Sequence, residues 1–179
     1  MLKHKQRKPL IMLTYLFSTL RNRLKVPTAR NLFNTTNLRR KSRNKLLKKS
    51  GVVITGESAV TPPFFYEYGR ITIGQGVYIN TGCVFLDHAS ISIGDNTLIG
   101  PNVTLTTASH ETSPELRCSG VTQAPISIGH KVWLGAGVVV LPGVTIGNNS
   151  VIAANSVVRS DVPENTLYAG SPAVFKRNI

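Results

Sequence analysis

Residues 128–162 read IGHKVWLGAGVVVLPGVTIGNNSVIAANSVVRSDV, and one pattern recurs in this stretch every six positions. A large aliphatic residue opens each repeat, and a small or β-branched residue follows it four positions later. The aliphatic residues are Ile128, Leu134, Val140, Ile146, Ile152 and Val158, and the following residues are Val132, Val138, Val144, Ser150, Ser156 and Val162. Alternation every second residue would indicate flat strands, whereas a strict period of six requires a turn in every repeat.

The same period extends toward the N-terminus. It holds at Ile73, Ile79 and Phe85, followed by Val77, Cys83 and Ala89, and it resumes after two extra residues at Ile93, Ile99 and Leu105. Three turns of this kind close one triangular coil, whose large aliphatic side chains point inward and stack on those of the next coil. The sequence therefore predicts an all-β core, a parallel β-helix over residues 71–163.

Glycine and short polar residues occupy the predicted corners. They include Gly74-Gln75-Gly76, Gly94-Asp95-Asn96 and Gly147-Asn148-Asn149. Glycine and asparagine suit such corners because they accept a left-handed backbone conformation at low cost. Cys83 stands at a small-residue position of the repeat, which favours a structural role over a nucleophilic one.

Three segments fall outside the regular coil. Residues 51–70 precede it and are interpreted as a connection. The period breaks at residues 111–125, which are polar and do not repeat, and this break predicts a loop ejected from the coil. Long loops on a regular scaffold are usually functional. Residues 164–179 leave the repeat, and we expect them to fold over the last coil as a short cap.

Residues 1–50 form a basic arm. They hold fifteen of the 21 Lys and Arg residues and no Asp or Glu, while the rest of the chain holds 6 basic and 8 acidic residues. The net charge of +13 is therefore a property of the arm. Apolar residues at alternating spacings of three and four predict an amphipathic helix that Pro27 ends, and a second helix is expected over residues 29–49. The stripe consists of Leu10, Leu13, Phe17, Leu20 and Leu24.

Two roles for the arm stay open. A basic amphipathic helix is typical of attachment to an anionic membrane surface. The same helices would also serve as a hairpin packed on the core or on a neighbouring subunit, and nucleic-acid binding is less favoured than either. Cys83 and Cys118 do not form a disulfide framework, and the apolar run near the N-terminus lacks a small-x-small cleavage site. We expect a cytoplasmic protein, and peripheral contact with the inner membrane surface stays open.

A set of motifs runs in one order through roughly residues 50–177. They are Pro62-Pro63-Phe64, Tyr68-Gly69, Ile73-Gly74, Asp87, Ile93-Gly94-Asp95-Asn96, Thr107-Ala108-Ser109-His110, Val132-Trp133-Leu134-Gly135, Pro142-Gly143-Val144-Thr145-Ile146-Gly147 and Ala169-Gly170-Ser171-Pro172-Ala173. This set resembles the hexapeptide-repeat maltose, galactoside and nodulation O-acetyltransferases. The resemblance implies a left-handed parallel β-helix, a homotrimer with active sites between subunits, and acetyl-CoA as the donor substrate, with no metal.

The resemblance also implies roles by position. His110 matches the catalytic histidine of the family, Asn80 matches its acceptor-site asparagine, and Tyr78 matches the aromatic residue beside that asparagine. Two departures concern the acceptor: His88 stands where the galactoside enzymes carry a second acidic residue after Asp87, and Glu67 replaces their serine. Asp87, His88 and Glu67 are candidates for binding the acceptor, together with Tyr78.

The cofactor-binding residues are implied in the same way. Trp133 and Ala136 match the strand along the pantetheine, and Ala154, Arg159 and Arg177 match positions at the far end of the coenzyme. Lys176 is a further candidate, because the coenzyme carries phosphates that basic side chains bind through charge-assisted hydrogen bonds. Trp133 precedes the inward Leu134, so we expect its indole to point outward.

Transfer of an acetyl group to a hydroxyl requires a base, and a histidine suits this task near neutral pH. His110 is the last residue before the ejected loop, where a side chain can face a groove. A backbone N–H at Ala136 is a candidate donor to the oxyanion of the intermediate. Asp87 and His88 are expected either to bind sugar hydroxyls or to form a structural pair at a corner.

These inferences predict an acetyl-CoA-dependent O-acetyltransferase acting on a saccharide, for which a precursor of a surface polysaccharide is one option. The alternatives are an N-acetyltransferase for an amino sugar, nucleotide sugar or drug, and a non-catalytic scaffold that binds membrane or nucleic acid. A zinc site is disfavoured, because His88, His110 and His130 lack the closely spaced pair that would begin such a site.

Overall fold

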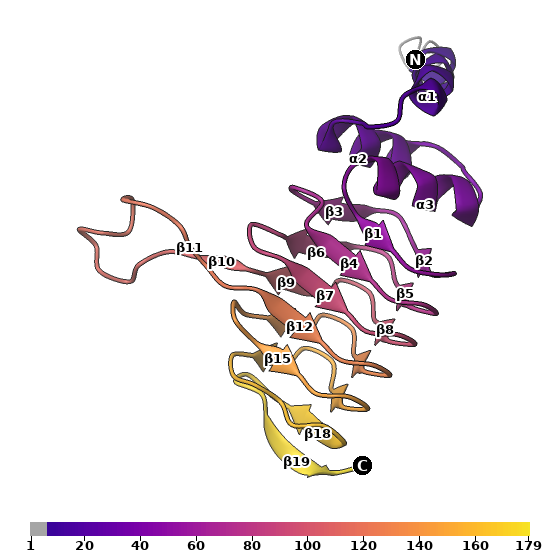
Figure 1. The fold of residues 1–179 in the computed structure, drawn as a ribbon. Coiled ribbons are helices and arrows are strands. Elements are labelled where there is room, and N and C mark those ends of the chain that lie inside the picture. Colours follow the sequence, from indigo (N-terminus) through magenta and orange to yellow (C-terminus); the bar gives the residue numbers. More distant parts are fainter. Residues whose placement is uncertain (1–6) are drawn as a thin grey trace, which may run out of the picture.

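The computed structural model describes residues 7–179, with side chains from residue 13 onward, and its core is a triangular prism of short parallel strands (Figure 1). Face A contains β1 (Val53–Ile54), β4 (Ile71–Ile73), β7 (Ile91–Ile93), β12 (Ile126–Ile128) and β15 (Thr145–Ile146). Face B contains β2 (Ala59–Val60), β5 (Tyr78–Ile79), β8 (Leu98–Ile99), β13 (Trp133–Leu134), β16 (Val151–Ile152), β18 (Thr166–Ala169) and β19 (Val174–Asn178). Face C contains β3 (Phe64–Tyr66), β6 (Cys83–Leu86), β9 (Thr104–Thr106), β14 (Val139–Val140) and β17 (Val157–Val158).

The six-residue period corresponds to one face and one corner of the prism. Each aliphatic and following position of residues 128–162 is buried, as the sequence predicts. Equivalent residues stack coil on coil, so that Ile93 pairs with Ile73 on one side and with Ile128 on the other. The backbone at the third residue of the corners is left-handed, with φ of 57° at Asn96 and 60° at Asn149. The predicted parallel β-helix is confirmed.

The first coil begins at Val53, so residues 51–70 are part of the β-helix and their interpretation as a connection is wrong. β1 pairs in parallel with β4, β2 with β5, and β3 with β6. The inward residues Ile54, Val60 and Tyr66 are six apart and buried. The repeat is concealed in this coil because the residues four positions after Val60 and Tyr66 are Phe64 and Arg70, which are neither small nor β-branched. The Tyr66 hydroxyl lies 2.7 Å from Ser50 Oγ, which gives the buried phenol a polar partner.

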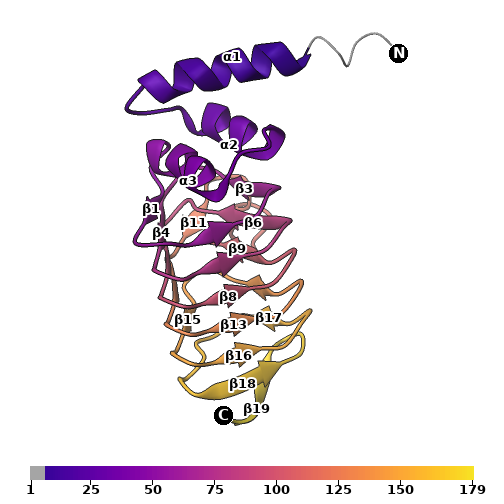
Figure 2. The ribbon, with the colours of Figure 1, turned by 90° about the vertical axis from the view of Figure 1, so that its right-hand side faces the viewer.

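Three helices cover the N-terminal end of the prism (Figure 2). They are α1 (Arg7–Leu20), α2 (Val26–Thr35) and α3 (Arg40–Lys49). The single helix predicted for residues 29–49 is therefore wrong, since it is divided between α2 and α3. Pro27 lies in the first turn of α2 and does not end α1, because a proline in the first turn needs no N–H partner. Phe33 of α2 packs edge to face on Phe64 of β3 and closes the core.

The two remaining irregular segments follow the predicted outline. β10 (Ala108–Ser109) and β11 (Thr122–Gln123) pair in antiparallel fashion and carry the ejected loop away from the coil (Figure 1). At the C-terminal end, β18 adds to face B beside β16, and β19 folds back antiparallel to β18. The two ends of the prism are thus covered by helices and by a β-hairpin.

Candidate active site

The predicted site residues divide between two edges of the prism. The corner that joins face C to face A, called here the C–A edge, carries Glu67, Asp87, His88, His110 and Arg159. The others lie on face B, on β19 at its end, or at the corner that joins face B to face C. This second set comprises Tyr78, Asn80, Trp133, Ala136, Ala154, Lys176 and Arg177. A single chain therefore does not bring His110 and Asn80 together.

His110 directly follows β10, at the base of the ejected loop. Its Nδ1 atom lies 3.1 Å from the carbonyl oxygen of Arg117 and 3.2 Å from that of Gly120. Carbonyl oxygens only accept hydrogen bonds, so Nδ1 carries the proton and Nε2 of the neutral ring is left as the proton acceptor. The side chain is exposed in the single chain. The loop thus holds the imidazole in the tautomer that a general base requires.

A buried carboxylate organises the C–A edge one coil above His110. Asp87 is fully buried, and its Oδ1 accepts the N–H groups of Glu67 at 2.6 Å and Tyr68 at 3.1 Å. Its Oδ2 accepts the N–H of Arg70 at 2.7 Å. Both oxygens are therefore engaged by the preceding corner, and the structure favours the corner role of Asp87 over the sugar-binding role.

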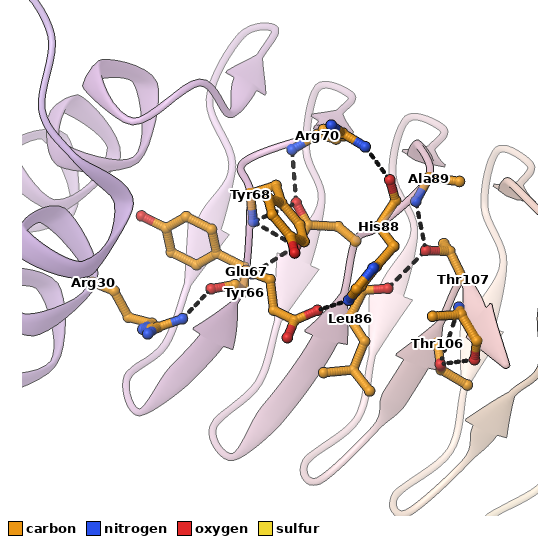
Figure 3. Close-up of polar contacts among 12 residues, drawn as sticks. Arg30, Tyr66, Glu67, Tyr68, Arg70, Leu86, His88, Ala89, Thr106 and Thr107 are labelled. Carbon is orange, nitrogen blue, oxygen red and sulfur yellow. Dashed lines mark hydrogen bonds and ion pairs between the residues drawn. The ribbon is translucent and has the colours of Figure 1, made fainter. Parts of the chain in front are cut away.

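The corner fixed by Asp87 presents Glu67 to His88 (Figure 3). Glu67 Oε2 lies 2.9 Å from His88 Nε2, and both side chains are partly exposed. The ring of Tyr68 stands edge to face on the imidazole with centroids 5.0 Å apart, and Arg70 donates a hydrogen bond to the carbonyl oxygen of His88. Because Nε2 faces the carboxylate, Nδ1 of a neutral His88 and the second oxygen of Glu67 remain for a ligand.

Face B carries an apolar groove of about 640 Å³. Outward side chains of successive strands form its floor, with Tyr78 paired to Leu98 and Leu98 paired to Trp133. Trp133 is 54% exposed, which confirms that its indole points outward. Asn80 lines the same groove, and its Oδ1 accepts the N–H of Thr81 at 2.8 Å, so its amide NH2 is the part available to a ligand.

A backbone donor lies along this groove. Ala136 lines it, and within residues 7–179 its N–H makes no hydrogen bond. The preceding Gly135 has to be glycine, because a Cβ there would stand 2.5 Å from the backbone nitrogen of Ala154 in the next coil. This close stacking gives the groove a narrow backbone wall in which the N–H of Ala136 is free to bind a ligand oxygen.

The basic candidates lie toward the C-terminal end. Arg177 of β19 pairs with Leu167, which lines the groove, and Lys176 is its exposed neighbour. Arg159 is exposed but stands on the C–A edge, below His110. Arg159 thus lies on the same edge as His110, whereas Lys176 and Arg177 lie on the side of the groove, as Asn80 does.

Two further features bear on the choice of site. A groove of about 740 Å³ runs along the corner between faces A and B and includes His130 and Glu164, but it contains none of the predicted site residues. Cys83 is buried, and burial raises the pKa of its thiol to about 11, which supports the structural role predicted for it. Among the described residues, no group of three or more His, Cys, Asp or Glu side chains converges as a metal site would require.

Two contributions to the site were missed by the sequence reasoning. The carbonyl groups of Arg117 and Gly120 orient His110, and the side chain of Leu98 forms part of the groove floor. Backbone carbonyls carry no sequence signal. Leu98 directly precedes the inward Ile99, which is the relation that Trp133 has to Leu134, so the repeat could have identified it.

The chain is similar in sequence to known families and proteins. Residues 125–160 match the model of the bacterial transferase hexapeptide (six repeats), and residues 90–107 match that of the hexapeptide repeat of succinyl-transferase. The chain is 42% identical over 160 residues to a galactoside O-acetyltransferase of Escherichia coli, covering 88% of this chain and 79% of that protein. It is 47% identical over 131 residues to nodulation protein L of Rhizobium meliloti, covering 72% of each.

A solved structure extends the likeness to the fold. The crystal structure of a hexapeptide-repeat acetyltransferase from Vibrio cholerae, complexed with acetyl coenzyme A, matches with a TM-score of 0.81 and 36% identity. The match covers 98% of this chain and 90% of that one.

Proposed function

The chain belongs to the hexapeptide-repeat acetyltransferases and is an acetyl-CoA-dependent O-acetyltransferase, and we propose that its acceptor is a saccharide bound between two copies of the chain. The observation that carries the chemistry is the contact of His110 Nδ1 with the carbonyl groups of Arg117 and Gly120. This contact leaves Nε2 ready to accept a proton from an attacking hydroxyl. The proposal includes a precursor of a surface polysaccharide as one candidate acceptor.

In the proposed reaction, an acceptor hydroxyl attacks the thioester carbonyl while His110 Nε2 takes its proton. The N–H of Ala136 stabilises the negative charge on the carbonyl oxygen. When the carbon–sulfur bond breaks, the imidazolium returns the proton to the departing thiolate. The products are an acetyl ester and free coenzyme A, and the enzyme is restored without a covalent intermediate. The amide of Asn80 is positioned on the groove side to orient the acceptor.

The division of the site supports a homotrimer. His110 and Arg159 stand on the C–A edge, whereas Trp133 and Ala136 belong to the groove of face B. A cyclic assembly would bring the C–A edge of each copy against face B of the next and complete three equal sites. The far end of the coenzyme would then lie between Arg159 of one copy and Lys176 and Arg177 of its neighbour.

The acceptor is proposed to contact Glu67 and His88. Their pair offers hydrogen-bond acceptors at the second carboxylate oxygen and at Nδ1, and both suit sugar hydroxyls. The same proposal includes a cytoplasmic location with the basic arm in contact with the inner membrane surface. Among residues 7–179, no helix has the length and apolar character needed to cross a membrane.

Acceptor screening tests the activity. The full chain is incubated with acetyl-CoA and a panel of neutral sugars, amino sugars and uronic acids, and free thiol is measured. Thiol release that depends on a neutral sugar, with the ester located on a hydroxyl by NMR, is the expected result. Acetylation confined to an amine would replace the O-acetyltransferase by the N-acetyltransferase alternative.

Mixed trimers test the shared site. His110→Ala and Asn80→Ala variants should each be inactive alone, because each removes one half of every site. Co-expressed with different affinity tags and purified as mixed trimers, they should regain about a third of the wild-type activity, since a ring that contains both variants joins two intact halves at one of its three sites. No recovery in trimers shown to contain both variants would contradict a site shared between copies.

A further inference from the structure

Four apolar residues of α1, Leu13, Leu16, Phe17 and Leu20, form a stripe that faces away from the protein. The stripe predicted from the sequence also included Leu24, and this part of the prediction is wrong, because Leu24 lies beyond α1 and packs against the core. Successive residues of a helix are about 100° apart, so the side that holds Tyr15 and Ser18 lies opposite the side that holds Leu13, Leu16, Phe17 and Leu20. Ser18 is buried and Tyr15 packs on the core, whereas the four apolar residues are between 50% and 80% exposed. The helix is thus amphipathic, but its apolar side faces outward, whereas the apolar side of a helix that contributes to the core faces inward.

Contacts with the body fix this orientation. Lys49 Nζ donates to the carbonyl groups of Ser18 at 2.8 Å and Thr19 at 3.0 Å, in the last turn of α1. The N–H of Leu24 donates to the carbonyl of Lys49 at 2.9 Å, and the Leu24 side chain packs against the core. α1 therefore lies across the N-terminal end of the prism, roughly perpendicular to its axis (Figure 2). Its exposed stripe points away from the active-site coils.

The charge around the stripe identifies the kind of surface that would cover it. Arg21, Arg23 and Lys25 follow α1 and are exposed, and residues 1–50 hold fifteen basic residues and no acidic one. A second copy of the same arm would bring like charges together, whereas an anionic lipid surface offers both apolar depth and opposite charge. The observations therefore favour a bilayer over a second copy.

The proposed trimer multiplies this surface. His110 leaves the third coil, and the groove of face B spans the coils from Tyr78 to Leu167. A threefold axis parallel to the prism keeps each coil at its own height, so His110 meets the neighbour's groove at the level of the groove itself. The same axis brings the three α1 helices to one end of the trimer, where three stripes face one plane and bind with avidity.

We propose that the enzyme docks end-on to an anionic membrane, with Leu13, Leu16, Phe17 and Leu20 of α1 inserted at the interface and the prism axis along the membrane normal. This proposal deepens the membrane contact of the proposed function and rests on the proposed trimer for the number of helices that bind. The active sites would then open sideways, parallel to the membrane, at a fixed height that suits saccharides attached to its surface.

Co-sedimentation of the full chain with vesicles tests the docking. Vesicles of equal parts phosphatidylglycerol and phosphatidylcholine are compared with vesicles of phosphatidylcholine alone. We expect at least about tenfold stronger binding to the anionic vesicles, weakened by raising NaCl from about 0.1 M to about 0.5 M, because salt screens the basic arm. The double variant Leu16→Ser with Phe17→Ser should lower the partition coefficient at least about tenfold, since it removes apolar insertion and keeps every charge.

Ile179→Ser is the matched control, because Ile179 is as exposed as Leu16 but lies at the opposite end of the prism. It should bind like the wild type, and all three proteins should keep the same thiol release in solution. Equal binding by the double variant would overturn the docking. The docking would also be overturned if sedimentation equilibrium showed that the wild type forms an assembly that the double variant loses, because a second copy would then cover the stripe. Vesicle binding without acetyl transfer to any acceptor would instead contradict the proposed function and leave the docking intact.

Discussion

Nδ1 of His110 lies 3.1 Å from the carbonyl oxygen of Arg117, so the ejected loop turns back on the residue from which it departs. The carbonyl of Gly120 approaches the same nitrogen at 3.2 Å. The loop therefore fixes which imidazole nitrogen can accept a proton. A histidine on the regular coil would lack these two carbonyl partners.

Replacement of His110 by alanine should lower kcat by about 10² to 10⁴, the usual contribution of a positioned general base. The KM for acetyl-CoA should change little, because His110 does not line the groove proposed to bind the coenzyme. Steady-state kinetics with the acceptor found by screening measures both constants. His130→Ala provides the control, since His130 stands at the corner between faces A and B, where its Nδ1 accepts the N–H of Asp95 and lies 3.7 Å from the carboxylate of the same residue. A His110 variant with nearly wild-type kcat would eliminate this residue as the base.

Replacement of Asp87 by asparagine should destabilise the protein without abolishing acetyl-CoA binding. An amide cannot accept from Glu67 and Arg70 on both sides, so at least one buried N–H loses a charged partner at a cost of about 1.5–3 kcal/mol. Urea unfolding at fixed protein concentration measures the change. Asp95→Asn is the comparison, because the side chain of Asp95 is about half exposed and its replacement should cost less than about 1 kcal/mol. Equal stability of the two variants would contradict the structural role of Asp87.

The sequence predicted the prism well because its period reflects a physical requirement. The residue six positions further along the chain takes the equivalent inward position on the next face of the prism. That position is enclosed by packed side chains, so it favours a large apolar residue. The prediction failed in the first coil, where a tyrosine takes an inward position. Tyr66 fills an inward position with its hydroxyl bound to Ser50, and this pair is visible only once α3 and β3 are in contact.

The site could be predicted residue by residue but not as an assembly. His110 could be singled out because it adjoins a break in the period, and the outward direction of Trp133 could be predicted because it precedes an inward leucine. The choice between the two roles expected for Asp87 required the structure, since its partners are backbone N–H groups twenty and seventeen positions away. The division of the site between two edges also required the coordinates, because the period alone does not say which corner each residue occupies.

Glu67→Ala and His88→Ala should each raise the KM for the saccharide and leave the KM for acetyl-CoA unchanged. Either change removes a hydrogen-bond acceptor from the C–A edge, and the remaining partner is then free to rotate, since the two side chains orient each other at 2.9 Å. The effects should be non-additive in the double variant, by the amount of their coupling. Kinetics at saturating acetyl-CoA measures this. Additive effects, or a change in the KM for acetyl-CoA, would argue against a joint role in acceptor binding.

The two cysteines should differ in reactivity and in their effect on alkaline stability. Cys118 is exposed in the ejected loop, whereas burial raises the pKa of the Cys83 thiol to about 11 from its ordinary 9.0. Thiol titration at pH 8 should therefore detect one group per native chain and a second only after unfolding, and Cys118→Ser should abolish the native signal. Two groups titrated in the native protein would contradict the burial of Cys83.

The raised pKa also sets the sign of the pH effect. Folding favours the neutral thiol of Cys83, so its contribution to stability is complete below about pH 9 and is lost as the pH rises toward 11. Tyr66 acts in the same direction, because burial raises its pKa to about 12. Between pH 8 and pH 10.5 the free energy of unfolding of the wild type should fall by about 2 kcal/mol per chain more than that of Cys83→Ala. The variant lacks the thiol, so of these two groups only Tyr66 still contributes. Urea unfolding at both pH values measures the difference, and parallel losses in the two proteins would show that Cys83 does not titrate with folding.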